Sequence, residues 1–200
     1  MEDTFIQLPL QIDPTSKAIS ASTSYESKPL SAELAALNTL HRSLLNLDTP
    51  IPPPPLPVNP KRSAQIQKLR ESGNASFRKG NYPEAIRMYT FGIEMAVGRP
   101  GWEPSALVRD EVSALYANRA QAHMAMQNWP QAMIDAESSV EMKRVGNTKG
   151  WWRKGRCLVE MGRLEEAMVW VGKALDVEED AELKALAKEI EKAVKKNENV

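Results

Sequence analysis

The spacing of apolar residues divides the chain into a short mixed front part and a long helical part. From residue 66 to residue 200 the apolar positions follow helical periodicity throughout. In the front part, the leucines at positions 34, 37, 40, 44 and 45 fall on one face at helical spacing, which predicts an amphipathic helix from about Ser31 to Leu47. Ser31 is the expected N-cap of this helix.

The segment before that helix has the pattern of a strand and its return. Residues 5–12 alternate partly between apolar and polar, and Pro9 restricts the strand to a sheet edge. Residues 13–17 are typical of a turn, and residues 18–23 could form the returning strand. This front segment is small and poor in aromatic residues, so we expect it to pack either on the rest of the chain or on a partner.

A proline-rich stretch separates the two parts. Seven of the 14 prolines lie in residues 50–60. Proline fixes φ and donates no backbone hydrogen bond, which predicts an extended polyproline spacer. The stretch also matches PxxP, so a ligand for another domain stays open as the second interpretation of this segment.

The helical part contains a repeat. Three blocks, at residues 73–85, 120–132 and 155–167, share a small residue, a bulky residue nine positions later and an alanine three positions after that. The small residues are Gly73, Ala120 and Gly155, the bulky ones Tyr82, Trp129 and Leu164, and the alanines Ala85, Ala132 and Ala167. A helix–turn–helix period of about 34 residues accounts for the second interval. The first interval requires an insertion, which we place around residues 98–104.

These blocks resemble the tetratricopeptide repeat family. The resemblance implies an all-α right-handed superhelix of three helix–turn–helix repeats, at residues 66–99, 113–146 and 148–181, with a capping helix at 182–197. The expected organisation is a front segment at 1–49, the spacer at 50–60 and the repeat domain at 61–200. In such a superhelix the first helix of each pair lines a concave groove that takes extended peptides.

Composition excludes several classes of function. The formal net charge is zero, which argues against a polycation built for nucleic acid. One cysteine and two histidines leave no intramolecular disulfide, no cysteine-based zinc cluster and little material for catalysis, so we expect no cofactor and no enzymatic activity. No apolar stretch is long enough to span a membrane, and direct membrane insertion is not expected.

The zero net charge hides an uneven distribution. Residues 1–60 carry three basic and six acidic residues, whereas residues 61–200 carry 23 basic and 20 acidic. Residues 142–159 contain six basic residues and no acidic one. This basic stretch falls on the first helix of the third repeat, and it directs attention to the chemistry of the expected groove.

Basic and amide residues recur on the first helices of the repeats. Arg70 and Asn74 share a helix face because they are four residues apart, and so do Lys149 and Arg153; Asn118 lies on the helix between them. Arginine donates bidentate bonds, lysine supplies a point charge, and asparagine donates without titrating. A positive groove with two amides is suited to carboxylates.

The same five positions resemble the carboxylate clamp of repeat domains that hold a peptide C-terminus. The resemblance implies that the ligand is the Glu-Glu-Val-Asp tail of cytosolic heat-shock chaperones, and that Gln121 and Met124 line the subsite for the side chains upstream. Arg70 departs from the lysine that the family usually has at this position. The charge is kept, but reach and geometry change.

Other residues fit packing better than chemistry. Cys157 is expected to be a small core residue rather than a nucleophile. His123 has no acidic or metal-binding partner at ligand spacing in the sequence, so it is expected to pack or to face the groove. Tyr82, Trp129 and Trp151 lie where repeat cores need bulk.

Nearly the whole chain resembles the small cytosolic repeat subunits of the fungal post-translational translocation complex of the endoplasmic reticulum. The front segment, the spacer, the insertion and the string Lys-Gly-Trp-Trp-Arg-Lys at residues 149–154 carry this resemblance. It implies a non-catalytic adaptor at the cytosolic face of that membrane, held there by a heterodimer with a single-pass membrane subunit. The cytosolic seventy-kilodalton heat-shock chaperone would be the clamp ligand.

Two alternatives remain open. One is a free cytosolic co-chaperone that uses the same clamp on the ninety-kilodalton or the seventy-kilodalton chaperone. The other is the regulatory half of an enzyme, because clamp domains are often joined to isomerases or phosphatases.

Overall fold

The computed structural model describes residues 8–22, 27–46 and 60–198, and it divides into two compact units. One unit comprises Met1–Pro57 with Pro100–Glu103, and the other comprises Val58–Arg99 with Pro104–Val200. The larger unit is helical throughout its elements, and the smaller one holds a two-stranded sheet and one helix. The predicted fold class, an all-α repeat superhelix with a small mixed N-terminal segment, is confirmed.

The front unit begins with a short hairpin. Strands β1 (Leu10–Ile12) and β2 (Ile19–Ala21) pair antiparallel, with Leu10 opposite Ala21. The Asp13 carboxylate stabilises the turn between the two strands, because it accepts hydrogen bonds from the backbone N–H groups of Thr15 and Ser16. The predicted strand and return therefore form, but shorter than expected; residues 5–7 and 23 of that prediction lie outside the described residues.

Helix α1 (Lys28–Leu45) follows the hairpin. The prediction that Ser31 is its N-cap is wrong: the Ser27 hydroxyl accepts the hydrogen bond from the Leu30 backbone N–H, and Pro29 lies in the first turn. Proline suits this place because its missing N–H would be unsatisfied there in any case. The helix therefore begins three residues earlier than the leucine pattern alone indicated.

One asparagine ties α1 to the hairpin. The Asn38 side chain accepts from the Ile19 N–H at 2.8 Å and donates to the Ile19 carbonyl at 2.7 Å. It thus satisfies both backbone groups of a residue in β2, as a neighbouring strand would. The apolar face of this unit is only partly covered, since Leu10 and Ile12 are 51% and 58% exposed.

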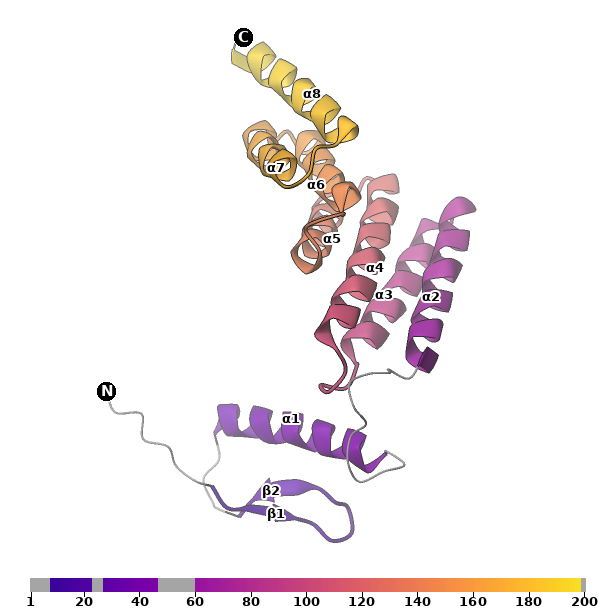
Figure 1. Ribbon diagram of the computed structural model, residues 1–200, viewed down its shortest axis with the longest axis vertical. Coiled ribbons are helices and arrows are strands. Elements are labelled where there is room, and N and C mark those ends of the chain that lie inside the picture. The colour runs from indigo at the N-terminus through magenta and orange to yellow at the C-terminus, as the bar shows by residue number, and fades with distance from the viewer. Residues whose placement is uncertain (1–7, 23–26, 47–59, 199–200) are drawn as a thin grey trace, which may run out of the picture. The chain divides into compact units, whose positions relative to one another are not determined.

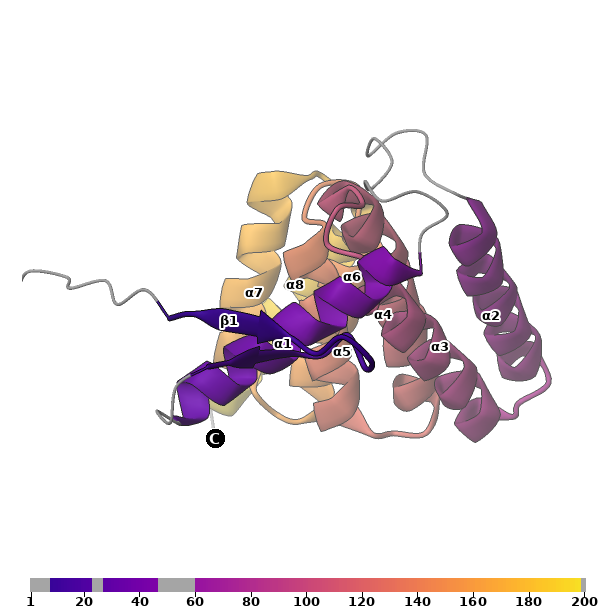
Figure 2. The ribbon, with the colours of Figure 1, turned by 90° about the horizontal axis from the view of Figure 1, so that it is seen from below.

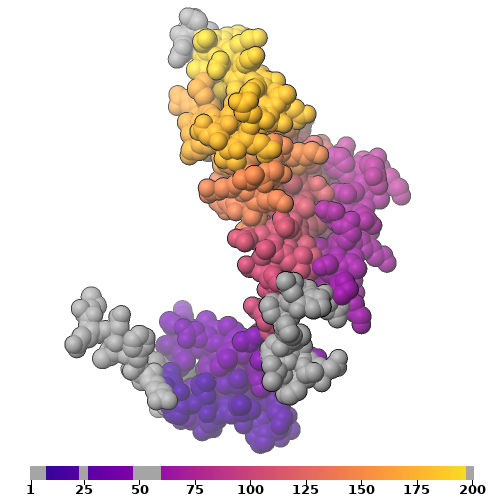
Figure 3. Space-filling model, viewed as in Figure 1, coloured from indigo at the N-terminus to yellow at the C-terminus, as the bar shows by residue number. Residues whose placement is uncertain are grey.

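The repeat unit consists of three helix pairs and a final single helix, coloured from magenta to yellow in Figures 1 and 2. The pairs are α2 (Pro60–Arg78) with α3 (Tyr82–Val97), α4 (Ser105–Ala125) with α5 (Trp129–Met142), and α6 (Thr148–Glu160) with α7 (Leu164–Val177); α8 (Ala181–Glu198) closes the series. In the space-filling view, the colours of the repeat unit succeed one another in chain order, as stacked pairs require (Figure 3). Residues 50–59 of the predicted spacer lie outside the described residues, and Pro60 is already helical.

Small residues are where the helices approach most closely. A Cβ atom added to Gly73 would lie 2.4 Å from the Tyr89 ring, and one added to Gly155 would lie 2.8 Å from Val171. The three repeated alanines, Ala85, Ala132 and Ala167, are fully buried. The repeated small residues therefore have the packing role that the sequence predicts.

The turn inside each pair has one left-handed residue. Gly80, Gln127 and Gly162 occupy equivalent positions, with φ of 76°, 58° and 73°. Glycine adopts this conformation without strain because it has no Cβ, whereas the Cβ of Gln127 comes too close to the following carbonyl oxygen. Between the first two pairs, the insertion is a loop at 98–104, and the 21 residues of α4 take up part of the added length.

Candidate peptide-binding groove

A hollow of about 350 Å³ lies between the first helices of the three pairs. Arg70 reaches it from α2, Asn118 from α4, and Lys149 and Arg153 from α6. Its remaining lining residues are Ala114, Ala117, Gly146, Asn147 and Thr148. The structure thus brings four of the predicted residues, which are up to 83 positions apart, to one place.

The fifth predicted clamp residue, Asn74, is linked to this hollow by a hydrogen bond. Its Oδ1 accepts from the Asn118 Nδ2 at 3.1 Å and from the Tyr89 hydroxyl at 2.8 Å. The two predicted amides are therefore in direct contact. The part played by Tyr89 is not visible in the sequence, where this residue is only one apolar position of α3.

Gln121 also lies with the clamp residues, but through Arg153. The Arg153 Nε donates to the Gln121 Oε1 at 2.8 Å. This bond fixes one edge of the guanidinium and leaves the amide nitrogen of Gln121 unused by it. Burial lowers the pKa of Arg153, because the charged guanidinium is partly removed from water there.

The cations of the hollow have no acidic partner. Within the described residues, no ion pair involves Arg70, Lys149 or Arg153, although basic residues nearby on α6 are paired: Lys154 with Glu137, and Arg156 with Glu160 and Glu189. Three positive charges therefore converge on one concave surface without a counter-charge. Such a surface is electrostatically suited to an anionic ligand with more than one carboxylate.

Asn147 positions the start of α6, and with it the clamp pair. Its Oδ1 accepts from the Gly150 N–H as an N-cap, while its Nδ2 donates to the carbonyls of Ser139 and Lys143, both at 3.0 Å. The cap therefore anchors α6 to the end of α5. Sequence reasoning missed this residue, although an asparagine before a helical run is a recognisable cap signal.

Met124 does not lie with the other six predicted site residues. It is 9% exposed and packs in a cluster with Ala132 and Cys157. This placement follows from helix geometry: Met124 is on α4, but on the side that meets α5 and α6. Its role as a subsite residue stays a prediction, and the described conformation offers little of its surface to a peptide.

His123 packs between helices, and the structure adds an acidic neighbour that does not lie at ligand spacing in the sequence. Its Nε2 lies 3.9 Å from the Asp135 carboxylate, which also receives a bidentate pair of hydrogen bonds from Arg119, both at 2.8 Å. His123 Nδ1 is buried without a hydrogen-bond partner, and burial lowers the pKa of His123. The residues are on α4 and α5, so this cluster holds that helix pair together.

The residues expected to pack do so. Cys157 is fully buried, and burial raises the pKa of its thiol to about 12, so it is not a thiolate at neutral pH. Trp151 is 5% exposed and packs at a tilt against Trp170, with ring centroids 4.4 Å apart. The Tyr82 ring packs at a tilt against Phe77 beside the first turn, and Trp129 packs against the cluster that contains Cys157.

Two other kinds of site are absent from the described residues. No group of three or more histidine, cysteine, aspartate or glutamate side chains in residues 8–22, 27–46 and 60–198 is arranged to hold a metal ion. No helix within those ranges combines the length and the apolar character that crossing a membrane requires.

Comparison with known proteins identifies relatives of this chain and solved structures with the same fold. No protein-family model matches it. The ER protein translocation subcomplex subunit sec67 of Schizosaccharomyces pombe is 35% identical over 135 residues, which are 66% of this chain and 70% of that protein. A chain in the cryo-EM structure of the Sec complex from S. cerevisiae has the same fold, with a TM-score of 0.74, 24% identity, and coverage of 94% of this chain and 99% of that one.

A third likeness concerns the repeat unit alone. The first TPR domain of Spaghetti (RPAP3), solved with the HSP90 peptide SRMEEVD bound, is 28% identical over 66% of this chain and 94% of its own, with a TM-score of 0.54. The resemblance to tetratricopeptide repeat proteins of the Sec complex, expected from the sequence, is confirmed. The shared length and identity show that this chain belongs to the family of the ER protein translocation subcomplex subunit sec67.

Proposed function

We propose that this protein is a non-catalytic adaptor of the post-translational translocation machinery of the endoplasmic reticulum. It docks cytosolic heat-shock chaperones, the seventy-kilodalton class first, by clamping their acidic C-terminal Glu-Glu-Val-Asp tails, and so delivers presecretory proteins to the translocon. Membership of the sec67 family and the fold shared with a Sec complex chain support the translocation part. The HSP90 peptide bound to the Spaghetti (RPAP3) domain supports the tail as ligand.

The proposed binding of chaperone tails is supported above all by the cations that meet in the hollow without an acidic partner. Arg70, Lys149 and Arg153 line one hollow with the Asn118 amide, and no acidic residue among those described neutralises them. The tail ends in an α-carboxylate beside an aspartate side chain, which places two negative charges at its last residue. Lys149 and Arg153 donate charge-assisted hydrogen bonds to these carboxylates. The bonds offset the cost of removing the charged Arg153 guanidinium from water.

Titration with tail peptides tests the clamp. The full chain is titrated with an octapeptide ending Glu-Glu-Val-Asp, with its C-terminal amide, and with the peptide that lacks the final aspartate. A hydrogen bond to a charged group contributes about 1.5–3 kcal/mol, so Arg153→Ala and Lys149→Ala should each weaken binding by about 10- to 150-fold. Equal affinities for the three peptides would contradict the clamp.

A matched variant controls for net charge. Lys188 is an exposed lysine on α8, outside the lining of the hollow, so Lys188→Ala removes the same charge without touching the site. Its affinity for the tail should equal that of the wild type within about twofold, because exposed charges beyond about 10 Å are screened at ordinary salt. If Lys188→Ala weakens binding as much as Lys149→Ala, the attraction comes from net charge rather than from a clamp.

The front unit is proposed to bind the single-pass membrane subunit of the complex and to hold the adaptor peripherally at the cytosolic face of the membrane. Its support is the incomplete core: none of the residues of α1 is fully buried, and Leu10, Ile12, Leu40 and Leu45 are 42–58% exposed. A two-stranded sheet with one helix is marginal by itself, and a partner would cover these side chains. Ile12→Lys should release the protein from the membrane fraction without changing its tail affinity.

The alternative, a free cytosolic co-chaperone, uses the same clamp and differs in location. Cell fractionation separates the two. Recovery of the wild-type protein in the membrane fraction, and its loss after salt or alkaline extraction, fits a peripheral adaptor. Recovery only in the soluble fraction would refute the translocation part and leave the clamp in place.

A further inference from the structure

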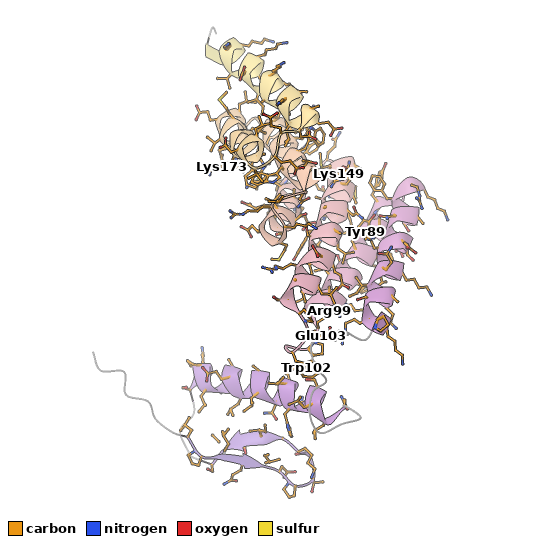
Figure 4. The ribbon with its side chains drawn as sticks, in the orientation of Figure 1. Tyr89, Arg99, Trp102, Glu103, Lys149 and Lys173 are labelled. Carbon is orange, nitrogen blue, oxygen red and sulfur yellow. The ribbon has the colours of Figure 1, made fainter. Side chains whose placement is uncertain are left out.

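A tyrosine from the outer helix of the first pair reaches the clamp. Tyr89 lies on α3, is 2% exposed, and its hydroxyl is 2.8 Å from the Asn74 Oδ1 on α2 (Tyr89 is labelled in Figure 4). The ring occupies the space that a side chain at Gly73 would need, since a Cβ there would lie 2.4–2.9 Å from three ring atoms. Gly73 therefore lets the tyrosine pass close to the α2 backbone, directly beside Asn74.

The hydrogen bonds around Asn74 fix which way its amide faces. Its Oδ1 accepts from the Tyr89 hydroxyl and from the Asn118 Nδ2, so both of its lone pairs are used. Its Nδ2 makes no hydrogen bond to another described residue. Because Asn118 presents its Nδ2 here, the opposite orientation of Asn74 would bring two amide nitrogens together, which is a contact between two donors. The carbonyl oxygen would then face an arriving carboxylate.

The Tyr89 hydroxyl is held as a donor by its surroundings. Burial raises the pKa of Tyr89 against the opposing charges of Arg153 and Arg78, which keeps the hydroxyl protonated at neutral pH. A guanidinium cannot accept a hydrogen bond, so the hydroxyl hydrogen is directed away from it. The Asn74 Oδ1, at 2.8 Å, accepts this hydrogen.

We propose that Tyr89 is a positioning residue of the clamp: its hydroxyl, together with Asn118, locks the Asn74 amide with Nδ2 directed to the carboxylates of the bound tail. This inference rests on the proposed function of the groove and adds a residue to it. The groove is then organised before the tail arrives, and the tail does not have to reorient the amide on binding. Asn118 keeps its second amide hydrogen for the ligand.

Tyr89→Phe tests this role because it removes one oxygen and keeps the ring in place against Gly73. Loss of a neutral hydrogen bond that orients a binding group should weaken the Glu-Glu-Val-Asp octapeptide by about three- to tenfold. In the Asn74→Ala background the same substitution should have no further effect, since the group that it orients is gone. Tyr82→Phe, on the same helix but with its ring against Phe77, is the matched control and should bind like the wild type.

The double-mutant cycle separates positioning from a general structural effect. If Tyr89→Phe loosened the packing of the first pair, it would weaken binding equally in the wild-type and Asn74→Ala backgrounds. Equal losses in both backgrounds, or no loss in the wild-type background, overturn the positioning role and leave the clamp intact. A wild-type chain that does not distinguish the octapeptide from its C-terminal amide overturns the proposed function and, with it, this role.

The orientation can also be observed without peptide. The side-chain amide signals of Asn74 in a nitrogen–proton NMR spectrum are identified by their loss in Asn74→Ala. Tyr89→Phe should shift and broaden them, because one of the two bonds that hold the amide is removed, whereas Tyr82→Phe should leave them unchanged. Unchanged Asn74 signals in Tyr89→Phe overturn the proposal.

Discussion

Substituting Asp135 by asparagine should destabilise the repeat unit through a single buried ion pair. Asp135 lies on α5 and accepts two hydrogen bonds of 2.8 Å from Arg119 on α4. Arg119 also donates to the Thr90 hydroxyl on α3 at 2.9 Å and lies over the Tyr116 ring. The side chains of Asp135 and Arg119 are 6% and 19% exposed. This pair therefore joins three helices, including the one that carries Asn118.

The size of the expected loss of stability follows from the state of Arg119 after the substitution. The substituted asparagine would keep one acceptor oxygen, but its nitrogen would face a donor of Arg119, and the largely buried guanidinium would lose its hydrogen-bonded carboxylate. Breaking one partner of a buried ion pair costs about 3–5 kcal/mol. Because Arg119 keeps its bond to Thr90 and part of its solvent contact, we expect a loss of about 3 kcal/mol. In a chain of this size that corresponds to a fall in Tm of about 6–12 °C.

Urea unfolding followed by circular dichroism and tryptophan fluorescence measures this loss. The matched control is Glu84→Gln, which neutralises the acidic partner of an exposed pair with Arg87; the two side chains are 34% and 62% exposed. That change should remain within about 0.5 kcal/mol of the wild type. A loss below about 1 kcal/mol for Asp135→Asn, or equal losses for the two variants, would refute the reasoning from burial.

Three further predictions concern the turns, the buried histidine and the cysteine. Gly162→Ala should cost about 1 kcal/mol in the free energy of unfolding, since φ there is 73°, whereas Gln127→Gly, at the equivalent turn, should stabilise by up to about 1 kcal/mol. Chemical denaturation compares the two variants with the wild type, and a stabilising Gly162→Ala or a destabilising Gln127→Gly would contradict the turn argument. The pKa of His123 is lowered by burial below its usual 6.5, so its contribution to stability is present above that pH and is lost as pH falls below it. The thermal midpoint of the wild type should therefore fall between about pH 7 and about pH 5, and that of His123→Leu should fall less; parallel curves would exclude His123 as the cause. The Cys157 thiol, with a pKa raised to about 12 and no exposure, should react with an alkylating reagent at about pH 8 far more slowly in the folded protein than in urea, as a timed mass measurement would show; equal rates would contradict its burial.

Local patterns in the sequence were enough to predict the helices, their pairing and the faces of the first helices. Periodicity and the repeated small residues are local properties, and a residue such as Gly73 is required wherever two helix backbones approach closely. Spacing by four placed Arg70 with Asn74 and Lys149 with Arg153, because such positions lie on one face of any α-helix. The resemblance to a clamp then joined the two pairs into one expected site.

Which side chains meet across helices depended on tertiary packing. The contact of Tyr89 with Asn74, the approach of His123 to Asp135 and the burial of Met124 depend on how one helix is rotated against the next. Helical periodicity fixes angles within one helix, but it leaves that rotation to the packing of complementary surfaces. For the same reason the sequence predicted the charges of the groove, whereas the bonds that hold those charges and amides in place became visible only with the helices packed together.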